Sequence, residues 1–182
     1  MILIKFGDGL MLHESDEKSK LQISDADVSF NDVYQNPNLS PELLEKIKAA
    51  DILVLPYADF RGYYNCLFPE QTYQFYTHLI KEAKKQNLSV DIGVSDEDYK
   101  EIELHADVVN IADILIQWVL FPVVTGMISA YLYDLVRQRK KKMNATVKIT
   151  VERNGKAKTV NFEGDIENFE RAMKSIDEII FK

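Results

Sequence analysis

A short apolar run at residues 1–6 and a partial alternation of hydrophobic and polar residues at 21–30 predict two β-strands near the start of the chain. The expected inward positions of the second strand are Leu21, Ile23, Val28 and Phe30. Ser40 is a good helix N-cap and Pro41 fits a first helical position, so we expect a helix to follow them. The start of the chain therefore predicts strands followed by a helix.

Residues 52–104 predict a small α/β unit. An apolar strand at 52–56 is ended by Pro56, a helix is expected at 69–86, and a second strand at 88–94. This βαβ order favours a parallel pair of strands. A further short strand is expected near 102–104. The apolar stripe expected on the helix is Tyr73, Tyr76, Ile80 and Ala83.

The last forty residues show a clear ββα pattern. Apolar residues alternate with polar ones on both sides of Asn154-Gly155, a pair that supplies the positive φ angles of a type I′ hairpin turn. The inward positions of the hairpin are Val147, Ile149, Val151, Val160 and Phe162. Asp165 is the expected cap of the final helix. Its apolar stripe is Ile166, Phe169, Met173, Ile176 and Ile180.

Residues 114–133 form a run of twenty residues without a charged side chain. We expect a long apolar helix over 114–136, kinked by Pro122. Gly126 with Ala130, and Thr125 with Ser129, make two pairs of small residues that let helices approach closely. A basic flank follows at once, formed by Arg137, Arg139, Lys140, Lys141 and Lys142.

Together these elements predict an α+β fold in three segments. They are an N-terminal α/β domain (1–106), the apolar helix with its basic flank (107–142) and a ββα unit (143–182). The chain has 182 residues, of which 46% are hydrophobic, enough for one domain or two small ones.

Charge is distributed unevenly. Residues 137–158 contain nine Lys and Arg and one Glu, which gives them a net charge of +8. The whole chain has a net charge of −7, so the remaining residues together carry −15. A basic band in an acidic protein suits an anionic surface or an acidic partner, and the acidic remainder makes nucleic acid an unexpected ligand. The single cysteine fits a reducing compartment, and the short apolar N-terminus is not typical of a secretory signal, so we expect a cytoplasmic protein.

No catalytic or cofactor motif stands out. The glycines are scattered singly, which disfavours a phosphate-binding loop. Cys66 and His78 would make a nucleophile and base only if the fold joined them, and the three histidines lack metal-site spacing. We therefore expect no enzyme activity, no cofactor and no metal, with an unrecognised site in the aromatic loop as the remaining alternative. The aromatic cluster around that loop has two interpretations, core packing or a partner-binding patch formed by Arg61, Tyr63 and Tyr64.

The apolar helix admits two interpretations. Its length matches a bilayer, and Trp118 lies near one end while Tyr131 and Tyr133 lie near the other. A membrane span would place its positive flank in the cytoplasm and require export of the N-terminal domain without a signal. Burial against other copies or a partner needs no such export. The residues expected to form this assembly or membrane surface are Trp118, Phe121, Pro122, Gly126, Ala130 and Tyr131.

The C-terminal layout, "WVLFPVVTGMISAYLYDLVRQRKKK", then "VKITVERNGKAKTVNFEG" and a closing amphipathic helix, resembles the effector-associated constant component proteins of bacterial conflict systems. The resemblance covers about the last seventy residues. It implies a non-enzymatic accessory or adaptor that works beside an effector in antiviral defence (bacterial immunity). We therefore expect an oligomerising adaptor that binds itself or an effector protein. The alternative is an effector that inserts its apolar helix in the inner membrane.

Overall fold

The computed structural model describes residues 3–6, 19–57, 66–103, 108–176 and 179–181. Within them the chain forms an α+β structure built on one mixed sheet, which confirms the predicted fold class. The strands are β1 (Leu3–Phe6), β2 (Lys20–Asp25), β3 (Ile52–Leu55), β4 (Leu67–Pro69), β5 (Val90–Ile92), β6 (Lys100–Ile102), β7 (Val108–Asn110), β8 (Asp113–Gln117), β9 (Asn144–Arg153) and β10 (Lys156–Asp165). The helices are α1 (Phe30–Tyr34), α2 (Pro41–Ala49), α3 (Thr72–Lys84), α4 (Phe121–Arg139) and α5 (Ile166–Ile176).

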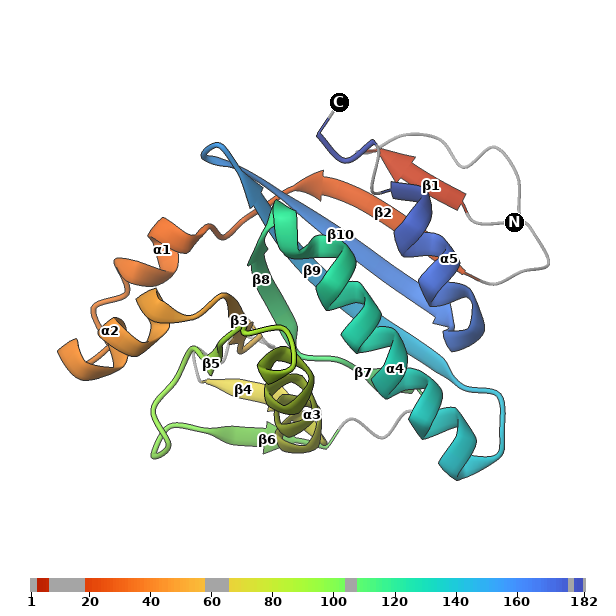
Figure 1. The fold of residues 1–182 in the computed structure, drawn as a ribbon, viewed down its shortest axis with the longest axis horizontal. Helices are drawn as coiled ribbons and strands as arrows, with labels where there is room; N and C mark the ends of the chain where they lie inside the picture. The colour runs from red at the N-terminus through yellow and green to blue at the C-terminus, as the bar shows by residue number, and fades with distance from the viewer. Residues whose placement is uncertain (1–2, 7–18, 58–65, 104–107, 177–178, 182) are drawn as a thin grey trace.

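The main sheet has the strand order β1-β2-β10-β9-β8-β3-β5, and β7 also pairs with β9 (Figure 1). The predicted parallel pair is present, because β3 and β5 run side by side in the same direction. Strands β4 and β6 form a separate parallel pair. The sheet draws strands from all three segments that the sequence suggests, so the segments share one hydrophobic core.

Two layers of helices cover the sheet. Helices α3, α4 and α5 pack on one face, where they bury a large apolar cluster with every second residue of β3, β8, β9 and β10. Figure 1 shows α4 and α5 lying across the strands on that face. On the other face α1 and α2 bury a smaller cluster, formed by Phe30, Ile47, Leu53, Leu55 and Leu115. The strands β3 and β8 are thus buried on both faces, while the opposite face of β9 and β10 is largely polar.

The C-terminal unit follows the prediction closely. Asn154 and Gly155 have φ angles of 52° and 74°, as a type I′ turn requires, and β9 and β10 pair in register on either side of them. The Asp165 carboxylate accepts a hydrogen bond from the Glu167 backbone N–H (3.0 Å), which confirms the expected cap. All five residues of the predicted stripe of the last helix are buried.

Residues 114–120 depart from the predicted helix. Ile114, Leu115 and Ile116 belong to strand β8, a short 3-10 turn follows at Trp118–Leu120, and α4 begins only at Phe121. The prediction was wrong because a strand buried on both faces is apolar at every position, as a buried helix is. Pro122 lies in the first turn of α4, where its missing N–H has no partner to lose, so it starts the helix and does not kink it.

Two smaller differences from the sequence prediction concern the buried face of α3 and the end of β2. Helix α3 buries Thr72, Phe75, Leu79 and Ala83, whereas Tyr73 of the predicted stripe is 68% exposed and Ile80 is 42% exposed. Strand β2 ends at Asp25, and Phe30 is buried from helix α1, where Ser29 and Asp32 form a capping box.

The basic band is also divided. Its two clusters, at 137–142 and 153–158, lie at opposite ends of the ten-residue strand β9, a separation of about 30 Å. They therefore do not form one positive surface.

Candidate functional site

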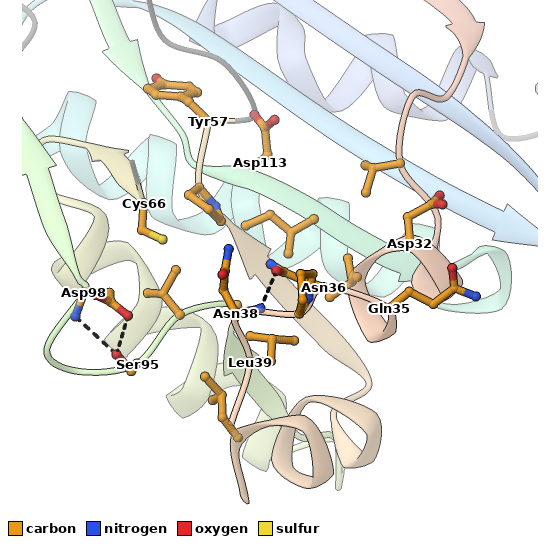
Figure 2. Close-up of a pocket in the computed structure, with 18 of the residues that line it drawn as sticks. Asp32, Gln35, Asn36, Asn38, Leu39, Tyr57, Cys66, Ser95, Asp98 and Asp113 are labelled. Carbon is orange, nitrogen blue, oxygen red and sulfur yellow. Dashed lines mark hydrogen bonds between the residues drawn. The ribbon is translucent and has the colours of Figure 1, made fainter. Parts of the chain in front are cut away.

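A cleft of about 600 Å³ lies on the α1–α2 side of the sheet (Figure 2). One wall comes from the segment that joins α1 to α2. The other comes from the chain that follows β3 and β5, with the first residue of β8 and one residue each of β9 and β10. The polar lining side chains include Asp32, Gln35, Asn36, Asn38, Tyr57, Ser95, Asp98, Asp113, Lys148 and Thr159.

The position of the cleft follows from the parallel pair. Strands β3 and β5 both end there, and the carboxyl ends of parallel strands are where α/β sheets commonly bind ligands. Gly93 lies directly after β5, and a Cβ atom there would lie 2.9 Å from Leu55 Cδ2, so a larger residue would displace the Leu55 side chain. Pro56 and Tyr57 follow β3 directly, and both line the cleft.

A buried ion pair lies in the cleft wall. Lys148 Nζ donates a hydrogen bond to Asp113 Oδ2 (2.7 Å), with Asp113 nearly buried and Lys148 one-third exposed. Burial raises the pKa of Asp113, and the neighbouring ammonium only partly opposes this effect. Burial, with the Asp113 charge as a smaller cause, raises the pKa of Tyr57 to about 12, so this phenol stays neutral.

The remaining carboxylates of the cleft, Asp27, Asp32 and Asp98, are exposed, and two of them accept hydrogen bonds from neighbouring serines. Asp32 accepts hydrogen bonds from the Ser29 backbone and hydroxyl, and Asp98 accepts one from the Ser95 hydroxyl (2.9 Å). In Figure 2, Ser95 and Asp98 lie on one side of the cleft with Cys66, and Asp32 and Gln35 lie on the other. The polar groups thus converge from segments far apart in the sequence.

Cys66 and His78, which would make a nucleophile and base only if the fold joined them, have separate roles in this structure. Burial, reinforced by Asp98, raises the pKa of the Cys66 thiol, which keeps it protonated and weakly nucleophilic at neutral pH. His78 lies on α3, with Nε2 at 2.9 Å from the Met127 carbonyl oxygen of α4 and its ring against Tyr131. This imidazole therefore ties α3 to α4.

The predicted assembly surface is split between core and solvent. Phe121 and Tyr131 are buried, Trp118 is half-buried and stacks on Phe121 (ring centroids 5.2 Å apart), and Pro122, Gly126 and Ala130 are exposed. Thr125 and Ser129 are buried and donate hydrogen bonds to carbonyl groups one turn earlier. Hence only part of the small-residue face of α4 is open.

The basic flank and the partner patch are the two other sites predicted from the sequence. All five residues of the basic flank (Arg137, Arg139, Lys140, Lys141 and Lys142) are exposed, and Arg137 lies 3.9 Å from Asp134. The partner patch of Arg61, Tyr63 and Tyr64 lies outside the described residues. Among the described residues, no group of three or more His, Cys, Asp and Glu side chains is placed to hold a metal ion.

One helix in the described part of the chain, Trp118–Arg139, is long and apolar enough to cross a membrane, with a mean hydropathy of 1.6. Half of its most apolar window is buried within the chain itself. A core helix of a soluble protein has the same properties, so this helix alone does not separate the two interpretations.

Comparison of the chain with protein-family models, curated proteins and solved structures finds no match.

The cleft was not predicted from the sequence, because the residues next to Asp113 and Lys148 in the chain form no recognisable binding motif. Asp113 precedes an apolar run, and Lys148 is one polar residue in an alternating strand. Their pairing follows from the parallel contact of β8 with β9.

Proposed function

We propose that this protein binds a small organic molecule in the cleft at the carboxyl ends of β3 and β5, and that it acts without catalysing a reaction. The observation that carries this proposal is the cleft itself. Its volume of about 600 Å³ lies within the usual range for small-molecule sites. Its walls combine apolar side chains, such as Leu39, Leu55 and Val94, with a few convergent polar groups.

The absence of an activated nucleophile among the described lining residues favours binding over catalysis. Cys66 is held protonated, and Asp113 is paired with an ammonium and not with a second acid or a histidine. A paired, buried charge in a preformed cleft is well suited to orient a ligand.

Ligand-observed NMR with a library of neutral, cationic and anionic fragments tests this proposal. We expect a subset of fragments to bind and to lose binding when Asn38→Trp fills the cleft. Asn38 is exposed and lines the cleft, so the larger ring enters the cleft and not the core. The matched control is Gln74→Trp on the exposed face of α3, which should leave binding unchanged. Binding that survives Asn38→Trp, or no binding by any fragment, would refute the proposal.

A second proposal is the oligomerising adaptor role in a bacterial defence assembly. It is supported by an uncharged strip along the outside of α4 and the turn before it, made of Val119, Pro122, Val123, Gly126, Ala130 and Tyr133. Val119 is 78% exposed in this strip. A second copy of the chain offers a matching uncharged strip by symmetry, and Gly126 and Ala130 allow two helix backbones to approach.

Mass measurement in solution tests this second role. We expect a dimer or larger assembly at micromolar concentration that Val119→Glu and Gly126→Leu convert to monomer, whereas Gln74→Glu leaves it intact. A wild-type monomer across that range would contradict assembly through α4.

Membrane insertion is the alternative outcome, and it requires α4 to leave the sheet, because Val124, Ile128 and Leu132 are buried there. Sedimentation with liposomes would detect it.

A further inference from the structure

We infer that the ligand of the cleft carries a hydrogen-bond donor next to an acceptor, as the edge of a carboxamide does. Asp113 accepts a hydrogen bond from the donor of this edge, and Lys148 donates one to its acceptor. The inference rests on the proposed ligand-binding function and specifies its chemistry. It further implies that small anions are rejected. Three features of the described cleft residues lead to this conclusion.

The first feature is the hydrogen-bonding capacity of the pair. An ammonium donates three hydrogen bonds and a carboxylate accepts about four, whereas the contact between Lys148 Nζ and Asp113 Oδ2 uses one of each. Both groups line the cleft. A ligand edge with an N–H next to a C=O places its donor toward Asp113 and its acceptor toward Lys148 without breaking the pair. Neither a carboxylate nor an ammonium ligand can match both partners.

The second feature is the charge of the lining. Among the described lining residues, Asp27, Asp32, Asp98 and Asp113 oppose Lys148, which gives a formal net charge of −3. An anionic ligand would enter against this field, and it would compete with Asp113 for the same ammonium. Neutral ligands avoid both costs.

The third feature is the apolar part of the wall. Val28, Val33, Leu39, Leu43, Leu55 and Val94 line the same cleft. They offer a surface for a hydrocarbon or aromatic body, while the pair reads the polar edge. The ligand class is therefore a neutral molecule with an amide-type edge on an apolar or aromatic body.

Three isosteric probes separate the alternatives, namely benzamide, benzoate and benzamidine. They differ in the edge they present: donor and acceptor, acceptors only, and cationic donors only. We expect ligand-observed NMR titrations at pH 7 to show benzamide binding at least tenfold tighter than benzoate and tighter than benzamidine. Equal binding of benzoate would overturn the inference, and so would tighter binding of benzamidine than of benzamide, because charge alone would then select the ligand.

Substitutions of Asp113 and Lys148 test whether this ion pair recognises the ligand. Lys148→Met should weaken benzamide binding about tenfold, while Lys158→Met should change it less than twofold. Lys158 is a matched control, because it is also paired with an aspartate (Asp25, 2.6 Å) and its side chain is 34% exposed against 33% for Lys148. Asp113→Asn provides a second variant should Lys148→Met unfold, and it should reduce the preference for benzamide over benzoate at least threefold. Unchanged selectivity in the folded variants would overturn the inference.

The two proposals fail in different ways. If other fragments bind and are lost in Asn38→Trp, but benzamide shows no preference over benzoate, the binding function stands and the assignment of the amide edge is wrong. If Asn38→Trp leaves all fragment binding intact, the cleft is not the site, and both proposals fall.

Discussion

Gly126 lies on the exposed face of α4, and a Cβ atom added there would meet nothing within 4 Å. In an isolated chain, Gly126→Ala should therefore stabilise the fold by about 0.5–1 kcal/mol, because glycine is a poor helix residue. The melting temperature should rise by about 1–4 °C. Thermal unfolding at low concentration is the measurement. A loss of stability there would mean that the outer face of α4 is closely packed by something outside the described chain.

Lys148 is the counter-charge of a nearly buried carboxylate, so its removal should depend on pH. Breaking a fully buried pair costs about 3–5 kcal/mol, and we expect about 2 kcal/mol for Lys148→Met at pH 7, because Lys148 is one-third exposed. The pKa of Asp113 is raised on folding, so its charged form destabilises the fold once the pH exceeds the ordinary aspartate value. Without Lys148 the pKa rises further, and this penalty grows.

The stability difference between Lys148→Met and wild type should therefore be largest near neutral pH. It should shrink as the pH falls towards 4 and Asp113 becomes protonated in the folded protein. Urea unfolding between pH 4 and 8 measures this difference, with Lys158→Met as the control for an exposed pair. A difference that is the same at pH 4 and pH 7 would show that Lys148 contributes packing and not charge.

At the scale of elements, the sequence predicts an element well where its local pattern has one interpretation. The hairpin at Asn154-Gly155 and the helix capped by Asp165 are such cases, because turn chemistry and periodicity agree. The run 114–133 has two interpretations. Only the pairing of β8 with β3 and β9 makes its first residues a strand, and no local signal reports that pairing. Pro122 marks the boundary between the strand region and the helix, although it was expected to be a kink.

The junction of β10 with α5 offers a test at this scale. Gly164 has a φ angle of +155°, and a Cβ atom there would lie 2.6 Å from Ser19 Cα, which is backbone that cannot easily move. Gly164→Ala should destabilise the protein by at least about 2 kcal/mol and lower the melting temperature by about 5 °C or more. Gly126→Ala is the matched control, with the opposite sign. Unchanged stability would mean that the chain around Ser19 packs less closely on β10.

At the scale of the whole molecule, the candidate site is what sequence reasoning missed. The cleft joins the α1–α2 connection, the residues after β3 and β5, and single residues of β8, β9 and β10. Asp113 and Lys148 are 35 positions apart and meet only because β8 and β9 run parallel. A site assembled from connections and single strand residues far apart in the chain leaves no characteristic spacing in the sequence, whereas a motif held on one loop would.

The shared sheet also predicts how the molecule unfolds. The hairpin β9–β10 has β8 on one side and β2 on the other, and α4 and α5 bury one common cluster, so the C-terminal forty residues lack the rest of their core when alone. A hairpin with one helix is marginal in isolation. We expect a peptide of residues 143–182 to be largely unfolded by circular dichroism. The full chain should unfold in one transition, with Trp118 fluorescence and backbone circular dichroism coinciding, since Trp118 contacts both Phe121 and Phe181. Two separated transitions, or a peptide that melts cooperatively, would show that the C-terminal unit is an independent domain.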